Sequence, residues 1–211
     1  MAGKRIYHLY LAVYDNSRSA ALGRIHWGLL IGPKAEDPSS CRKTHGLFHA
    51  VYGAGHWKFE MLTFECVRSR SMLGRILLGE IKEDQMISVD AILQNESRLE
   101  TDNPRWNCWS WVEGALIDLQ GTNLVKWKAG NIDLQHLQTY GRQFSEEITA
   151  AGLDVGNGIP ATVIYPGKVP CVYSVFLLYD MLNAASEFRK RSSGEFSATT
   201  YQDVDTECVI Q

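Results

Sequence analysis

Residues 25–32 read Ile-His-Trp-Gly-Leu-Leu-Ile-Gly, an apolar run with one histidine, His26, near its start. A second run, Gly-Leu-Phe-His-Ala-Val-Tyr at residues 46–52, carries His49 at its centre. Both runs are rich in aliphatic and aromatic residues and are followed by turn-forming residues, which is typical of strands. If the two strands pair as antiparallel neighbours, the two imidazoles lie side by side on one face of a sheet.

Three further runs complete a predicted sheet in the first half of the chain. They cover residues 6–13, 57–64 and 74–81, and all three are mainly apolar. The regular spacing and the short polar connections favour antiparallel pairing, because parallel strands need longer crossovers.

The apolar period changes in the second half of the chain from that of strands to that of helices. A helix is predicted from Cys108, with Asn107 as its N-cap and Gly121 as its stop. Further helices are predicted over residues 133–151 and 173–189. Strands followed by helices indicate an α+β fold, with an antiparallel sheet packed against the Cys108 helix and additional C-terminal helices after it.

Length and composition fit one soluble domain. The chain has 211 residues, of which 45% are hydrophobic and 21% charged, as in ordinary globular proteins. We predict a single domain over residues 1–191 and a disordered tail over residues 192–211, where the sequence is polar. The formal net charge of −3 argues against a nucleic-acid partner.

The cysteines and the absence of targeting signals predict a cytoplasmic protein. Five cysteines without a C-x-x-C pair form neither a disulfide framework nor a zinc ribbon. The sequence has no signal peptide pattern, and no run approaches the roughly 20 apolar residues of a membrane span.

Several common reaction classes lack their motifs in this chain. The sequence contains no G-x-x-x-x-G-K-[ST] phosphate loop, no G-x-S-x-G elbow and no H-E-x-x-H zinc helix. We therefore expect no cofactor and no metal, and thiol and histidine chemistry remains.

Cys108 is the candidate nucleophile, in the sequence Trp-Asn-Cys-Trp-Ser-Trp-Val at residues 106–112. The partial positive charge of a helix N-terminus favours a thiolate, so we expect the thiol pKa to be lowered. The N–H groups of the first turn can also stabilise an oxyanion. The alternative is that Cys108 is a small buried apolar residue.

His26 and His49 are the candidate base and its orienter. One imidazole takes the thiol proton, and the second fixes the tautomer of the first through the other ring nitrogen. The alternative is that each is a satisfied packing residue. The other four histidines lack such a neighbour and are expected at the surface or in packing roles: His8, His45, His56 and His136.

Aromatic residues surround the candidate nucleophile. They can wall a pocket for an apolar acyl or aromatic substrate, with core packing as the alternative. The candidate pocket residues are Trp106, Trp109, Asn107 and Trp27.

Three segments, residues 26–32, 47–49 and 107–112, resemble the circularly permuted papain-like enzymes. That group includes the lecithin:retinol acyltransferase and phospholipase A/acyltransferase enzymes and the NlpC-type permuted peptidases. In these enzymes a His-Trp-Ala strand, a second strand histidine and an Asn-Cys at a helix start act as base, orienter and nucleophile. The resemblance implies these roles, in the same order, for His26, His49 and Cys108.

The chain resembles more closely a fungal family of small proteins without an established activity. The likeness rests on residues 25–34, 57–60 and 106–116. The chain departs from the acyltransferases in the residues after the cysteine and has no counterpart of their C-terminal membrane helix. These departures argue against a phospholipid substrate.

The leading hypothesis is a thiol-dependent hydrolase or acyl/amide transferase that acts on a small-molecule or peptide substrate. A different hypothesis is a catalytically inactive papain-like scaffold that binds a protein or small-molecule partner. A third is zinc binding by His26, His49 and Cys108, because both residue types are zinc ligands.

The last four residues, Cys-Val-Ile-Gln at 208–211, fit the C-a-a-X pattern for farnesylation of Cys208. Three basic residues at 189–191 give some upstream positive charge. One prenyl chain alone anchors a protein only marginally. We therefore expect membrane association only if Cys208 is farnesylated.

Overall fold

The computed structural model describes residues 4–16, 24–36, 44–64, 71–100, 102–152 and 161–167. All of them belong to one compact unit, residues 1–168, and a second unit, residues 169–211, contains none of them. The helix predicted over residues 173–189, the tail predicted over residues 192–211, and Cys208 lie outside the described residues.

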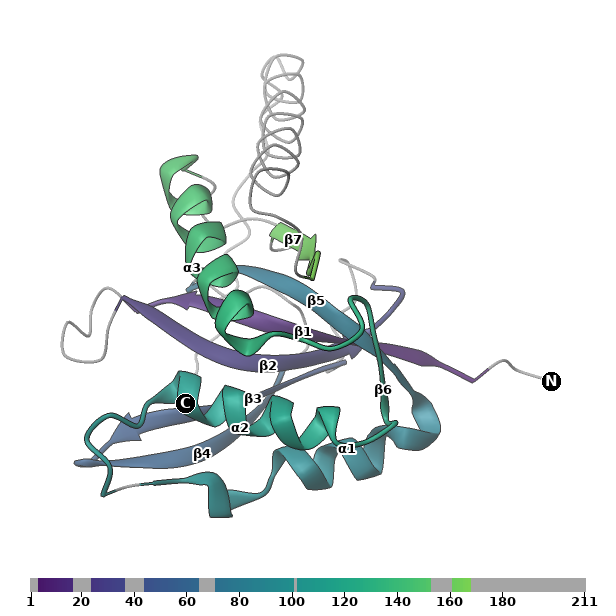
Figure 1. Cartoon of the computed structure of the whole chain (residues 1–211), viewed down its shortest axis with the longest axis horizontal. Helices are drawn as coiled ribbons and strands as arrows, with labels where there is room; N and C mark the ends of the chain where they lie inside the picture. The colour runs from purple at the N-terminus through teal and green to yellow at the C-terminus, as the bar shows by residue number, and fades with distance from the viewer. Residues whose placement is uncertain are drawn as a thin grey trace, which may run out of the picture. The chain divides into compact units, whose positions relative to one another are not determined.

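Five long strands form the predicted sheet, and each is longer than the run that predicts it. Their bounds are β1 Ile6–Asp15, β2 Ile25–Pro33, β3 His45–Gly53, β4 His56–Phe64 and β5 Met72–Lys82. They pair antiparallel in the order β4-β3-β2-β1-β5 (Figure 1). The predicted antiparallel sheet is therefore confirmed.

Two short strands join this sheet that the sequence does not predict. They are β6 Val125–Trp127, antiparallel to β5, and β7 Ala161–Ile164, parallel to β5. Segments this short carry too few residues to show a period, and pairing with a long central partner is what makes them strands.

The two predicted helices of the described region are α2 Cys108–Gln120 and α3 Leu134–Ala150. The side chain of Asn107 accepts hydrogen bonds from the N–H groups of Trp109 and Ser110, at 2.9 and 3.3 Å. It is the N-cap that the sequence predicts, and Gly121 is the C-cap. Because the five long strands come first and the helices follow them, the fold is α+β.

A third helix, α1 Met86–Leu93, lies between β5 and α2, with short 3₁₀ turns at Glu83–Gln85 and Glu96–Arg98. It buries only Val89 and Leu93, so its amphipathic signal is too weak for the sequence to predict it. Within the described ranges, no helix combines the length and apolar character needed to cross a membrane.

The helices pack on the face of the sheet that carries Trp27. Its ring lies 5.2 Å from that of Trp109 on α2, and a Cβ on Gly141 of α3 would come within 2.7 Å of it. A Cβ on Gly74 of β5 would likewise meet Phe144 of α3 at 2.7 Å. These glycines let α3 approach the sheet closely, with α3 over β5 and α2 against β2 and β3 (Figure 1).

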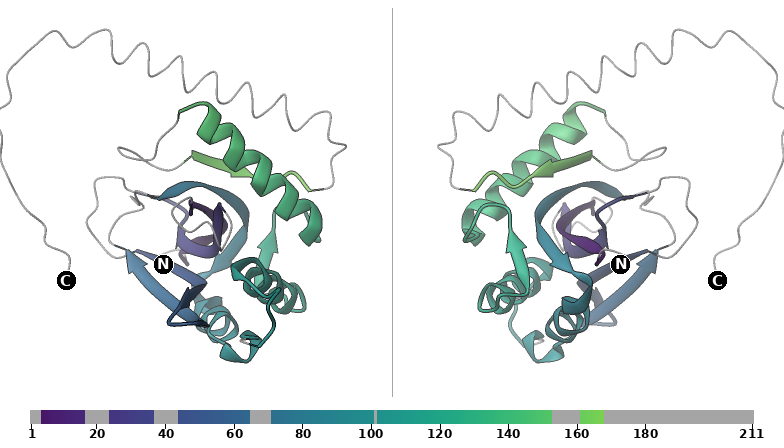
Figure 2. Two further views of the ribbon diagram at one scale, coloured as in Figure 1. Left: turned by 90° about the vertical axis from the view of Figure 1, so that its left-hand side faces the viewer. Right: turned by 90° about the vertical axis from the view of Figure 1, so that its right-hand side faces the viewer.

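The opposite face carries the residues that alternate with Trp27 along β2, because successive strand residues point to opposite faces. Figure 2 shows that the strands are strongly curved, with α3 outside the curve. A buried cluster fills part of this second face: Tyr10, Ala12, Tyr14, Leu30, Leu47, Met72 and Leu77. His26 is paired with Tyr14 and belongs to the same face.

Candidate active site

His26 and His49 are in direct contact. The register of β2 and β3 pairs Leu30 with Leu47, and this places both histidines on one face of the sheet. A hydrogen bond of 2.7 Å joins His26 Nε2 to His49 Nδ1, with the rings 5.0 Å apart and steeply inclined at 68°. The predicted adjacency of the two imidazoles is confirmed, and their catalytic roles stay predictions.

Gly28 is the residue that lets the two strands meet at the histidine pair. A Cβ at this position would lie 3.2 Å from both His49 Cβ and Phe48 O, and 2.7 Å from Leu47 Cδ1. Contacts this short are tighter than ordinary packing, so a side chain here would push β3 away from β2. The glycine of the His-Trp-Gly sequence therefore sets the distance between the imidazoles.

Cys108 lies at the first position of α2, where the sequence predicts it. Its thiol is free and buried, with 5% of the residue exposed. Asn107 occupies the N–H groups of Trp109 and Ser110. Of the N–H groups at this helix start, that of Cys108 has no hydrogen bond to another residue in the described part of the chain.

The backbone N–H of Trp27, the residue after His26, faces the Cys108 sulfur. In the β1–β2 ladder the Asn16 N–H donates to Arg24 O at 2.8 Å, and hydrogen-bonded pairs alternate along antiparallel strands. Odd-numbered residues of β2 therefore direct their N–H groups toward β3. Trp27 is one of them, and because the β2–β3 ladder ends at Leu29, its N–H is left for the thiol.

The thiol is thus placed beside β2 but is not bonded to the histidine pair. Among the described residues, no hydrogen bond joins Cys108 Sγ to His26 or His49. Catalytic hydrogen bonds are often long or poorly aligned before substrate binds. The structure brings together the two imidazoles, and it brings the thiol to the backbone of the residue adjacent to one of them.

Burial decides the protonation state of the thiol. It raises the pKa of Cys108 above the ordinary value, and the N–H groups of Trp27, Trp109 and Cys108, with the Arg142 guanidinium, lower it only in part. The predicted lowering of the thiol pKa is therefore wrong in its net direction, because desolvation of the thiolate outweighs the helix N-terminus. The resting group at neutral pH is the thiol.

Burial also keeps both imidazoles neutral. Desolvation, with the neighbouring His49, lowers the pKa of His26 to about 4, and Glu60 opposes this shift. Desolvation lowers the pKa of His49 to about 4 as well. A neutral imidazole can accept a proton, so His26 is in the form that a general base requires.

The candidate pocket residues lie mainly in the core. Trp27 is 2% exposed, and Trp106 and Trp109 are also buried, with Trp106 stacked edge-on against Trp57 at 5.4 Å. This burial matches the packing alternative, while Asn107 serves as the helix cap. A surface hollow of about 650 Å³ lies elsewhere, between α1 and α2, and Ile92, Arg98 and Ile117 are among its lining residues.

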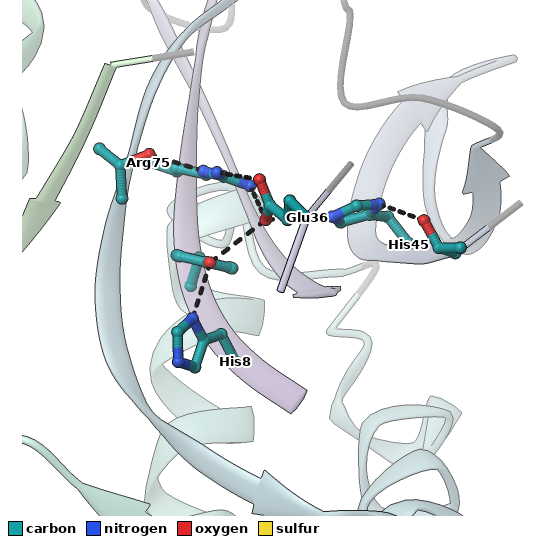
Figure 3. A network of polar contacts seen from close by, with 7 residues as sticks. His8, Glu36, His45 and Arg75 are labelled. Atoms are coloured by element: carbon teal, nitrogen blue, oxygen red, sulfur yellow. Dashed lines mark hydrogen bonds and ion pairs between the residues drawn. The ribbon is translucent and has the colours of Figure 1, made fainter. Parts of the chain in front are cut away.

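A second polar cluster lies on the same face of the sheet (Figure 3). The guanidinium of Arg75 donates two hydrogen bonds to Glu36, at 2.7 and 2.6 Å, and a third to Thr162 at 2.8 Å. His45 Nε2 lies 3.2 Å from the Glu36 carboxylate, and the Tyr10 hydroxyl donates to it at 3.3 Å. Sequence reasoning finds no part of this cluster, because its members come from separate strands and loops.

Burial would raise the pKa of Glu36, but hydrogen bonds from His45 and Arg75 outweigh it and hold the value at about 2. The carboxylate therefore stays ionised and paired with the buried Arg75. His45 is 4% exposed and packs into this ion pair rather than at the surface. The cluster ties the end of β2 to β3, β5 and β7.

The described ranges contain no group of three or more His, Cys, Asp or Glu residues placed to hold a metal ion. The zinc alternative for His26, His49 and Cys108 thus finds no support in their arrangement.

A family model described as a family of unknown function, DUF6914, matches residues 7–153. The chain belongs to this family. The DUF6914 match runs from β1 through α3 and includes both candidate histidines and Cys108. Comparison with curated proteins and with solved structures gives no match.

Proposed function

We propose that this DUF6914 protein is a thiol-dependent hydrolase or acyl/amide transferase related to the permuted papain-like enzymes. The observation that carries the proposal is the 2.7 Å contact between His26 on β2 and His49 on β3. The residue after His26 is Trp27, and its backbone N–H faces the Cys108 sulfur at the start of α2. In the proposed enzyme the neutral imidazole of His26 takes the proton of this thiol, which is the role of a base that activates a nucleophile.

In the proposed reaction, Cys108 Sγ attacks the carbonyl carbon of a small-molecule or peptide substrate as His26 takes the thiol proton. The Cys108 N–H stabilises the tetrahedral oxyanion. Collapse of this intermediate breaks the bond to the leaving group, which receives the proton from His26. Water or an amine then attacks the thioester, gives its proton to His26 and regenerates the thiol.

Labelling with an activity-directed electrophile, which reacts with an active-site nucleophile, tests this proposal. We expect covalent modification at Cys108 near neutral pH, identified by peptide mass, in preference to Cys41 and Cys66. His26→Gln is expected to slow the labelling by about 100-fold or more, because general-base catalysis contributes at least this much. Equal labelling of all three cysteines, or a His26→Gln variant that reacts at the wild-type rate, would contradict the enzyme hypothesis.

The alternative is a catalytically inactive scaffold that binds a protein or small molecule. The burial of Cys108, at 5% exposure, and the lack of a described hydrogen bond between its sulfur and either imidazole favour this alternative. A Cys108→Ala variant that restores full function to a strain lacking the protein would support the scaffold, and loss of function with normal folding would support the enzyme.

A further inference from the structure

Glu60 of β4 stands directly opposite His49 of β3 in the antiparallel ladder. The two-residue turn at Ala54 and Gly55 fixes this register, and both turn residues have positive φ, 51° and 85°, as a type I′ hairpin requires. Residues directly opposite in a ladder share one face of the sheet. Glu60 therefore lies on the same face as the two imidazoles, next to that of His49.

The carboxylate of Glu60 lies beside the ring nitrogen of His49 that His26 does not use. Glu60 Oε2 is 3.4 Å from His49 Nε2. The alignment falls short of a hydrogen bond, so His49 Nε2 is buried without a described hydrogen-bond partner. A buried N–H needs an acceptor, and an ionised carboxylate can only accept.

The tautomers of both rings follow from this order of acceptors. A carboxylate at His49 Nε2 favours the proton on Nε2, which leaves His49 Nδ1 as an acceptor. His26 Nε2 must then carry the proton of the 2.7 Å bond. The remaining nitrogen of His26, Nδ1, is left with a free lone pair, which is the state of a base.

We propose that Glu60 is a positioning residue that holds His49 and His26 in the tautomers in which His26 Nδ1 can accept a proton. The catalytic consequence rests on the proposed function, whereas the tautomers do not. Glu60, His49 and His26 form a series of acceptor, orienter and base.

Other charged or titratable groups lie around the histidine pair, Glu60 and the thiol. Lys58, two residues before Glu60, lies 3.6 Å from the second carboxylate oxygen. Tyr14 faces His26 with ring centroids 6.0 Å apart, and burial raises the pKa of its hydroxyl, so it stays neutral. Arg142 acts on the thiol. Glu60 is the described carboxylate in contact with the imidazoles.

The first test reads the tautomers directly by long-range ¹H–¹⁵N correlation of the full chain at neutral pH. We expect His26 and His49 both to carry the proton on Nε2 in the wild type. Glu60→Leu is expected to remove this preference, and Glu60→Gln, which keeps an acceptor oxygen, to retain part of it. Lys58→Met is the matched control on the same face of the same strand and should leave the tautomers unchanged.

A wild-type His26 protonated on Nδ1, or unchanged tautomers in folded Glu60→Leu, would overturn the proposal.

The second test compares rates of Cys108 alkylation by iodoacetamide. We expect Glu60→Leu to be slower than Lys58→Met by at least about tenfold, because a wrong tautomer removes the base. If the tautomers change in Glu60→Leu while His26→Gln is alkylated at the wild-type rate, the positioning role stands and the proposed function fails. If His26 sets the rate and Glu60→Leu alters neither readout, the proposed function stands and the positioning role fails.

Discussion

The protonation of a few buried side chains determines what this protein can do at a given pH. The thiol of Cys108 and the imidazoles of His26 and His49 are all held neutral by burial. A resting ion pair of thiolate and imidazolium is therefore disfavoured, and proton transfer has to accompany attack on the substrate.

The same burial predicts a loss of stability in mild acid. The pKa of each imidazole is about 4 in the folded protein and 6.5 in the unfolded chain. Below pH 6.5 the unfolded chain therefore binds protons that the folded chain does not, and stability falls until about pH 4. Between neutral pH and about pH 5 we expect a loss on the order of 2 kcal/mol for each imidazole, measured by urea unfolding.

The double variant His26→Gln/His49→Gln is the control, and its stability should change much less over this interval. Glu36 acts in the same direction but at lower pH: its pKa is about 2 in the folded protein and 4.5 in the unfolded chain, so its contribution to stability is lost only below about pH 4.5. A wild-type stability that is constant from neutral pH to pH 5 would contradict the low imidazole pKa values.

Tyr14 gives a second prediction at this scale. Its hydroxyl is buried without a described hydrogen-bond partner, and an unsatisfied buried hydroxyl costs about 1–3 kcal/mol. We expect Tyr14→Phe to leave the free energy of unfolding unchanged or to raise it by about 1 kcal/mol. Tyr10→Phe, which removes a hydroxyl bonded to Glu36, is the contrasting variant and should lower it. A clear loss on Tyr14→Phe would show that the hydroxyl has a partner.

At the scale of elements, the distance between β2 and β3 is the feature that creates the histidine pair. The ladder between these strands covers only Leu29–Ile31 and Gly46–Phe48. Beyond it the strands are held near each other by the close approach at Gly28 and by the imidazole contact itself.

We therefore expect Gly28→Ala to separate the imidazoles. The added Cβ overpacks the site, which costs about 1–3 kcal/mol, and labelling of Cys108 should slow with it. Gly121→Ala is the matched control, because a Cβ there meets its nearest atom at 3.4 Å and its φ is −67°. Loss of the His26–His49 hydrogen bond is checked by the imidazole ¹⁵N shifts. Unchanged shifts in Gly28→Ala would contradict the role given to this glycine.

At the scale of the whole molecule, the Glu36–Arg75 pair joins parts of the chain that are far apart in sequence. Arg75 on β5 is 3% exposed and bonds to Glu36, which follows β2, and to Thr162 on β7. A buried charge that loses its partner is strongly destabilising, whereas replacing both members can be neutral.

Glu36→Ala is accordingly expected to lower the free energy of unfolding by about 3 kcal/mol or more, measured by urea unfolding. The double variant Glu36→Ala/Arg75→Met should recover most of this loss. Lys4→Met, which breaks an exposed ion pair with Asp84, is the control and should cost less than about 1 kcal/mol. Additive losses in the double variant would show that the two side chains do not act as a pair.

The sequence alone predicts the elements that have strong periods or caps. The five long strands follow from apolar runs separated by turns, α2 follows from the Asn107 cap before an amphipathic stretch, and α3 follows from the helical period of residues 133–151. The side-by-side imidazoles follow as well, because strand alternation and nearest-neighbour pairing are local rules. Glu60 was open to the same reasoning, since the turn at Ala54 and Gly55 fixes its partner.

Tertiary structure alone decided the protonation states and the long-range contacts. The helix start at Cys108 predicts a lowered thiol pKa. The direction of the pKa shift, however, depends on how completely the folded chain removes water from the sulfur. The Glu36–Arg75 ion pair and the pairing of β7 with β5 join residues separated by dozens of positions. Local patterns carry no information about such contacts, because desolvation and ion pairing depend on the whole surrounding volume.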